Sequence, residues 1–169
     1  MKISLIAAMA ENRVIGNQGR LPWPHLPNDW ANFFRVTDGC KMIMGRKSYD
    51  TPDRLGSKVG NFVVSSQDNF PMDEGFVRVA DLHEALEKCK EDSEVFVIGG
   101  GEIFNQAMPL ANCIHLTVVH GIFEGDAFFP EIPSDFKIIS KQDFEADQNH
   151  AFAYSFVVYE RDKHKNSQT

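Results

Sequence analysis

The chain has 169 residues, of which 43% are hydrophobic and 24% charged, and its formal net charge is -7. These values are typical of one soluble domain, and they argue against nucleic acid as the main partner, because phosphate binding needs a concentrated basic surface. Cys40, Cys89 and Cys113 form no CxxC motif and have no histidines at metal-ligand spacing. We therefore expect reduced thiols in a cytoplasmic protein, without a disulfide or a metal site.

The first apolar stretch, Ile3 to Met9, has two interpretations. Preceded by Lys2, ISLIAAMA resembles the apolar part of a secretory signal with an A-x-A cleavage site. The stretch is at the short limit for such a signal, and the turn-prone ENRVIGNQG follows it. We therefore interpret it as a buried central strand, and no later segment has the length of a membrane span.

The stretch Leu21 to Thr37, LPWPHLPNDWANFFRVT, predicts a helix that begins near Asn28. Its three prolines disfavour helix before themselves, and Asn28 is the expected N-cap. Asp29 then lies in the first turn, on the same face as Phe33 and Val36. We expect this apolar stripe to face the core.

A carboxylate on such a stripe has two explanations. Asp29 can be an acid favoured near the positive end of a helix, with Trp23 and Trp30 filling the core around it. Alternatively, it is a functional acid held against aromatic side chains, because burying an unpaired ion costs several kcal/mol and calls for a polar partner, which can be a substrate.

The rest of the chain alternates predicted strands with short helices. A brief helix follows Gly45 and ends at Pro52, another carries Leu82 to Cys89, and a third follows the glycines at 99–101 and ends at Pro109. The predicted strands are 41–45, 61–65, 76–79, 94–98 and 114–119, and the segments 136–144 and 151–161 form a hairpin around EADQNH.

This pattern predicts a single α/β domain over residues 1–161. We expect a mostly parallel twisted sheet of eight strands with a C-terminal antiparallel hairpin, and four flanking helices on both faces of the sheet. Residues 162–169 are polar and are expected to form a frayed tail.

Two junctions between a strand and a helix indicate anion binding. In VFVIGGGEIF, the glycines allow backbone to approach a phosphate at the helix start, although a tight turn that needs positive φ explains them equally well. In IMGRKSYDT, Arg46 and Lys47 open a helix where cations are unfavourable unless an anion is bound. Two anion sites fit one dinucleotide, and an arginine beside Ser65 and Ser66 suits the 2′-phosphate of NADPH.

Five motifs, in order along the chain, resemble the dihydrofolate reductase family. They are VIGNQGRLPWPHLPNDWANFFRVT, MIMGRKSYDT, VIGGGEIFNQAMP, IHLTVV and EGDAFFPEI, and the resemblance extends from Ile3 to about Arg161. It implies reduction of 7,8-dihydrofolate to tetrahydrofolate by NADPH, with hydride transfer to C6 and a proton to N5, in the service of one-carbon metabolism.

The resemblance also implies the site residues. Asp29 would bind the pterin 2-amino and N3 groups and promote N5 protonation, with Thr117 hydrogen-bonded behind it and with Leu21 and Trp23 completing the catalytic group. The substrate pocket would further include Ile6, Ala8, Trp30, Phe33, Thr51, Pro52, Arg54, Lys58, Ile98 and Phe104. The cofactor would contact Ala8, Ile15, Gly16, Asn17, Gly45, Arg46, Lys47, Ser48, Ser65, Ser66, Ile98, Gly99, Gly100, Gly101, Glu102, Ile103, Phe104 and Asp126. Residues 15–21 would form a mobile loop, braced by Gly125 and Asp126.

Two departures from the family pattern concern ligand binding. RLGSKVGN replaces the usual PLPGRxN, so Lys58 or Arg54 would substitute for the arginine that binds the substrate's glutamate carboxylate. WPHLPND is one residue longer than in bacterial relatives, and Trp30 and Asn32 replace a usual leucine and a usual aromatic residue. We therefore predict insensitivity to the antifolate trimethoprim.

Two alternative functions stay open at this point. A related NADPH-dependent pyrimidine reductase of flavin biosynthesis would explain the glycine junctions but not the LPW and LPND motifs. A non-catalytic dinucleotide-binding module would explain the same junctions. Whichever function holds, we expect the protein to be a monomer.

Overall fold

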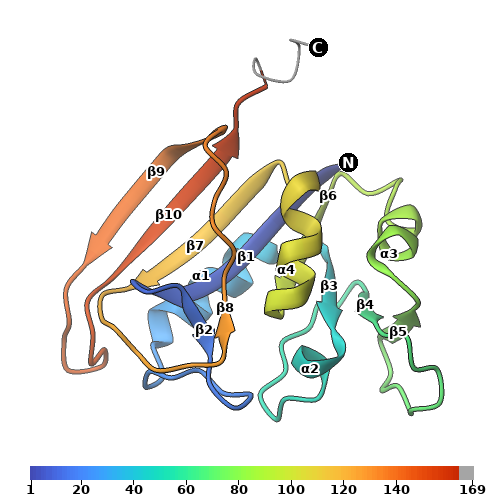
Figure 1. Cartoon of the computed structure of the whole chain (residues 1–169), viewed down its shortest axis with the longest axis horizontal. Coiled ribbons are helices and arrows are strands. Elements are labelled where there is room, and N and C mark those ends of the chain that lie inside the picture. The colour runs from blue at the N-terminus through green and yellow to red at the C-terminus, as the bar shows by residue number, and fades with distance from the viewer. Residues whose placement is uncertain (164–169) are drawn as a thin grey trace.

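The computed structural model describes residues 1–163 and contains one sheet of eight strands (Figure 1). Its strand order is β5-β4-β3-β6-β1-β7-β10-β9. The strands are β1 (Lys2–Ala10), β3 (Lys41–Gly45), β4 (Asn61–Val64), β5 (Phe76–Val79), β6 (Glu94–Gly99), β7 (Cys113–Val119), β9 (Phe136–Phe144) and β10 (Tyr154–Arg161).

All neighbouring strands from β5 to β7 are parallel, whereas β10 pairs antiparallel with both β7 and β9. The predicted fold class, the number of sheet strands and the terminal hairpin are therefore confirmed. The strand β1 lies between β6 and β7, as expected for the apolar stretch 3–9. The part of the predicted tail at 164–169 lies outside the described residues.

The sequence patterns missed two short strands, β2 (Val14–Gly16) and β8 (Ala127–Phe128), which pair with each other in a separate small sheet. Segments of three and two residues are too short to show an alternation of apolar and polar side chains. Their pairing brings the loop that follows β1 against the segment that follows β7.

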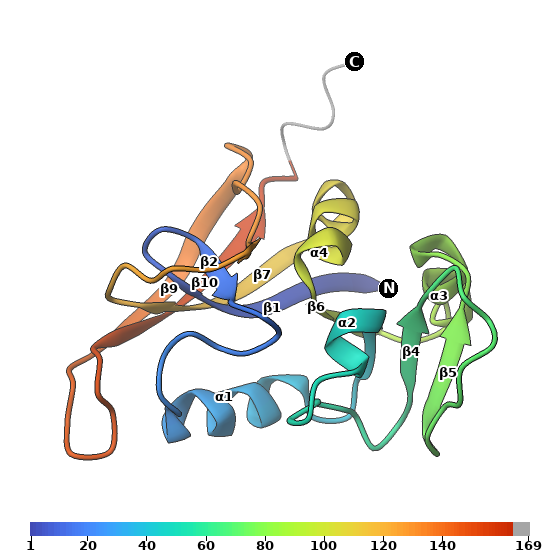
Figure 2. The same cartoon turned by 60° about the horizontal axis from the view of Figure 1, so that its bottom comes forward.

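Four α-helices cover the sheet, as predicted: α1 (Pro27–Thr37), α2 (Arg46–Tyr49), α3 (Leu82–Lys88) and α4 (Gly101–Ala107), which continues into a 3₁₀ turn at Met108–Leu110. Figure 2 shows α1 on one side of the sheet and α3 and α4 on the other. No helix within residues 1–163 is long and apolar enough to span a membrane. The cysteines at 40, 89 and 113 are all free thiols.

The first residues of α1 correct one prediction. Leu26 is the N-cap and Pro27 occupies the first helical position, so Asn28 lies inside the first turn. Proline is well tolerated there because its missing N–H has no helical partner in any case. The side chain of Leu26 caps nothing, which leaves the N–H of Asn28 in need of a partner.

The largest core cluster lies between the sheet and the pair α3 and α4. It includes Leu5, Ile43 and Val97 from the strands and Ala85 and Phe104 from the helices. Phe33 and Val36 of α1 are only partly buried, and Thr37 is the single buried residue of that helix. The prediction that the apolar stripe of α1 faces the core is therefore wrong. The stripe faces a cavity.

Candidate active site

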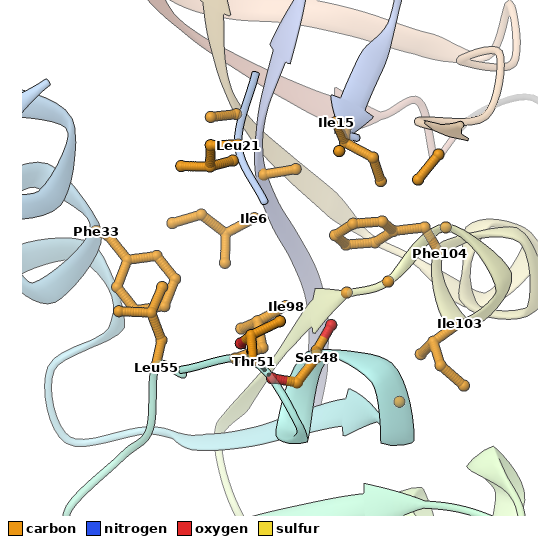
Figure 3. A pocket seen from close by; sticks show the side chains of 18 of the residues that line it. Ile6, Ile15, Leu21, Phe33, Ser48, Thr51, Leu55, Ile98, Ile103 and Phe104 are labelled. Carbon is orange, nitrogen blue, oxygen red and sulfur yellow. Dashed lines mark hydrogen bonds between the residues drawn. The ribbon is translucent and has the colours of Figure 1, made fainter. Parts of the chain in front are cut away.

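A cavity of about 2050 Å³ opens between α1 and the ends of the central strands. Pockets for one drug-sized ligand usually measure about 300–1,000 Å³, so this cavity has room for two ligands side by side. Side chains from α1, β1, β6, α2 and α4 line it. In Figure 3, Phe33 and Phe104 lie on opposite sides of Ile6, with Thr51 and Leu55 at a further wall.

Asp29 is the acid of this cavity. The hydroxyl of Thr117, on β7, donates a hydrogen bond to Asp29 Oδ1 at 2.6 Å. Burial raises the pKa of the Asp29 carboxyl above its usual range, and the hydrogen bond from Thr117 and the nearby His25 partly offset that rise. The carboxyl is thus poised to take up a proton more readily than an exposed aspartate.

The walls on both sides of Asp29 are largely apolar. Ile6, Phe33 and Ile98 line the cavity from β1, α1 and β6. Ile98 reaches it because the pairing of β3 with β6 shifts by one residue between Ile43 and Met44, which skips Ile98. A planar ring would find apolar contacts on its faces and an acid at its edge.

The glycine junction forms another wall of the same cavity. Gly99 has φ of +128, a conformation that side-chain-bearing residues rarely adopt, and a Cβ on it would lie 3.3 Å from Ser48 Oγ. A Cβ on Gly101 would lie 3.1 Å from the carbonyl oxygen of Phe128. Bare backbone therefore borders the cavity, and a phosphate-bearing ligand can approach its N–H groups.

The second predicted anion site is on the same side. Arg46, Lys47, Ser65 and Ser66 all line the cavity, together with Gln67, which receives a hydrogen bond from Arg46. Because α2 is a single turn, its dipole is small, so the two cations at its start are less unfavourable than we predict from the sequence. Arg46 instead pairs with Asp50 at 2.9 Å.

The loop at 15–21 closes part of the cavity and is held by Asp126. The backbone N–H of Gln18 faces the Asp126 carboxylate at 3.2 Å, and the N–H of Asp126 donates to the carbonyl of Gly16. A Cβ on Gly125 would lie 2.2 Å from Val14 Cγ1. Only glycine at this position lets the two segments pack so closely.

Comparison with known proteins agrees with this geometry. The family model for dihydrofolate reductase matches residues 2–161. The chain belongs to the dihydrofolate reductase family. It is 39% identical over 166 residues to the dihydrofolate reductase of Bacillus subtilis, covering 98% of this chain and 96% of that protein. It is 34% identical over 164 residues to dihydrofolate reductase type 3 of Salmonella typhimurium, and the match covers 96% of this chain and 100% of that protein.

A solved structure shows the same fold. The dihydrofolate reductase of Enterococcus faecalis, complexed with NADP(H) and RAB-propyl, superposes with a TM-score of 0.84 at 29% identity. The match covers 96% of this chain and 97% of that one. The ordered motifs of the sequence thus identified the correct family.

Of the site residues that the resemblance implied, all but three line the cavity of this dihydrofolate reductase. Asn17 instead forms a bridge with Arg20 at the base of its loop. Arg54 donates to the Tyr49 carbonyl, pairs with Asp73 and lies over the Tyr49 ring. Lys58 is exposed outside the lining.

The structure also adds residues that the motifs did not indicate. Arg35, His25, Leu55 and Gln67 line the cavity. Arg35 lies two residues after Phe33, which on a helix places the two side chains on different faces, so the apolar stripe of Asp29, Phe33 and Val36 gave no signal for it. No group of metal-ligating side chains occurs within residues 1–163.

Proposed function

We propose that Asp29 is the acid that drives the reduction of 7,8-dihydrofolate to tetrahydrofolate in this dihydrofolate reductase. Its carboxylate would bind the 2-amino and N3 groups of the pterin through two hydrogen bonds. The observation that carries this proposal is the Asp29 carboxyl with its raised pKa, in a cavity that also borders the glycine junction. One ligand can therefore meet the acid while a second occupies the adjoining space.

NADPH supplies the hydride, which is transferred to C6 while N5 takes a proton. The chain contributes the rest of the chemistry. Asp29 orients the pterin edge and favours protonation at N5, and Thr117 holds the Asp29 carboxylate. Ile6, Phe33 and Ile98 exclude water from the ring faces, which prevents loss of the hydride to side reactions.

The residues of the second half of the cavity fit NADPH. The backbone at 99–101 leaves space where side chains would intrude, as a pyrophosphate requires. Arg46, Ser65 and Ser66 would bind the 2′-phosphate, and Arg78 holds the Ser65 carbonyl at 2.9 Å. The loop at 15–21, with Ile15, Gly16 and Leu21 facing the cavity, would cover the nicotinamide.

Arg35, which also donates to Asn32 on the same helix, is our candidate cation for the glutamate carboxylate of the substrate. It lines the cavity on α1, whereas Arg54 is engaged with Tyr49 and Asp73. A guanidinium can also bind a carboxylate through two parallel hydrogen bonds, which a lysine ammonium at position 58 cannot. We therefore assign this contact to Arg35 in place of the two candidates expected from the sequence.

We further propose that residues 1–161 form one domain that acts as a cytoplasmic monomer. The free thiols suit a reducing compartment. Sedimentation velocity at assay concentrations tests the monomer, because a dimer would sediment faster. Cell fractionation tests the compartment.

The activity itself is tested by following NADPH absorbance with and without dihydrofolate. We expect absorbance loss that requires dihydrofolate and that Asp29→Asn removes at pH 7. Lys90→Ala, at an exposed pair with Glu87 outside the cavity lining, is the control and should keep the full rate. NADPH binding without turnover of dihydrofolate would overturn the proposal.

A further inference from the structure

In the first turn of α1, the backbone N–H of Asn28 finds its hydrogen-bond acceptor near the C-terminal end of the chain. Pro27 has no N–H, and the N–H groups of Asp29 and Trp30 both bond to the carbonyl of Leu26. The N–H of Asn28 donates instead to Nε2 of His150 at 3.1 Å. An imidazole in the loop between β9 and β10 thus caps the helix that carries the acid. Figure 2 shows that loop on the side of the molecule where α1 begins.

The hydrogen bonds of His150 show which ring nitrogen donates and which accepts. Because Nε2 accepts from Asn28, the ring proton is on Nδ1, which donates to Asp147 Oδ1 at 2.9 Å. This hydrogen bond is the main reason why the pKa of Asp147 lies below its usual range. Both ring nitrogens are thus used in contacts that fix the orientation of the imidazole.

Tyr154 also binds Asn28, through the side chain of that residue. Its hydroxyl accepts a hydrogen bond from Asn28 Nδ2 at 2.8 Å, and its ring lies 5.1 Å from that of His150. His150 is only 7% exposed, so little solvent reaches its ring to compete for these bonds. The backbone and the side chain of the residue before Asp29 are thus both tied to the hairpin.

The same hairpin strand also supports the other side of the acid. Phe156 of β10 pairs with Thr117, whose hydroxyl binds the Asp29 carboxylate. Tyr154, two residues earlier on β10, binds Asn28. One strand therefore sets both the start of α1 and the hydroxyl that the acid must meet.

We propose that His150 is a positioning residue for dihydrofolate reduction. It holds the first turn of α1 so that Asp29 lies at its contact with Thr117 and at the edge of the bound pterin. The inference rests on the role of Asp29 proposed above. Displacement of a catalytic group by about 1 Å can lower a rate by roughly 10²-fold, so a loose first turn would be costly for turnover.

The test compares two substitutions that differ in one property. His150→Phe keeps a ring against Tyr154 but removes the acceptor, and His150→Gln restores an acceptor near the position of Nε2. We expect the single-turnover hydride-transfer rate at pH 7 to fall about tenfold or more in His150→Phe and to recover largely in His150→Gln. The Kd for NADPH should stay within about twofold in both.

A control separates positioning from stability. His83→Phe, at an exposed histidine on α3, makes the same exchange away from the cavity and should leave the rate unchanged. If His150 only stabilised the fold, His150→Phe would lower the Tm while the folded enzyme kept its rate, and that result would overturn the proposal. Equal rates in the Phe and Gln variants would also overturn it.

The double variant distinguishes this inference from the proposed function. With Asp29→Asn in place, adding His150→Phe should slow hydride transfer no further, because the group being positioned is gone. If Asp29→Asn alone keeps its rate, the role of Asp29 fails and the inference with it. If Asp29→Asn is slow and His150→Phe is fast, only the inference fails. Should His150→Phe not fold, an unchanged rate in Tyr154→Phe would count against it.

Discussion

Thr117 and Asp29 are 88 residues apart in the chain, yet the Thr117 hydroxyl donates a hydrogen bond of 2.6 Å to the Asp29 carboxylate. The bond joins a central strand to the helix that covers the opposite wall of the cavity. It fixes the rotamer of the acid and favours its ionised form, while burial favours the protonated form. The balance between these two effects sets the pH range over which the acid can work.

Replacing Asp29 by asparagine tests the acid directly. Asparagine keeps the size of the side chain but cannot favour protonation at N5, so we expect Asp29→Asn to lose most of its hydride-transfer rate at pH 7. Part of the rate should return in acid, where solvent protonates N5. Stopped-flow measurements between pH 5 and 8 would show this, and a near-normal rate at pH 7 would contradict the prediction.

Removing the Thr117 hydroxyl should shift the pH profile. In Thr117→Val the ionised carboxylate loses a donor, so the already raised pKa of Asp29 should rise further. Protonated Asp29 then persists to higher pH, and the fall of the hydride-transfer rate with increasing pH should move upward. The profile of the wild type is the reference. A midpoint that stays in place or moves to lower pH would show that Thr117 does not control the acid.

Arg46 is expected to determine the cofactor preference. Arg46→Ala should weaken NADPH binding by about 1.5–3 kcal/mol, or roughly 10- to 150-fold, and leave NADH nearly unchanged, because only NADPH carries the 2′-phosphate. Fluorescence titration with both cofactors measures the difference. Equal losses for the two cofactors would assign Arg46 a structural role, through Asp50 and the Phe70 ring that it covers.

The contact with the substrate's glutamate tail can be assigned by a pair of alanine variants. Arg35→Ala should raise KM for dihydrofolate about tenfold, because it removes a charge-assisted contact, while kcat changes little. Lys58→Ala is the matched control, since Lys58 lies outside the cavity lining. A rise in KM in Lys58→Ala and none in Arg35→Ala would restore the assignment expected from the sequence.

Trp30 is expected to reduce trimethoprim binding. Its side chain lines the cavity beside Asp29, and its ring packs against the His25 ring with 5.3 Å between the ring centroids. A compact inhibitor depends on local fit, so a change that costs about 2–4 kcal/mol would raise its Kd roughly 30- to 1,000-fold. We expect weak inhibition of the wild type and stronger inhibition of Trp30→Leu. A low-nanomolar inhibition constant in both proteins would refute this.

Local patterns were sufficient for most of the fold. The strands at 41–45, 76–79 and 136–144 have the predicted bounds. For 41–45 the apolar run reports directly on burial. The helix of Asp29 was also visible, although its start was placed one residue late because proline fits the first helical position. The glycine junction was found by the same kind of local reasoning.

The sequence by itself therefore determined the eight strands of the main sheet, the four helices and the family, and it indicated Asp29 as the candidate acid. Only the tertiary structure decided which polar groups meet that acid. The pairing of Thr117 with Asp29, the capping of α1 by His150 and the exclusion of Lys58 from the cavity all depend on strand order and loop path. Propensity and periodicity act over a few residues, whereas a hydrogen bond between distant segments forms only after the sheet has brought them together.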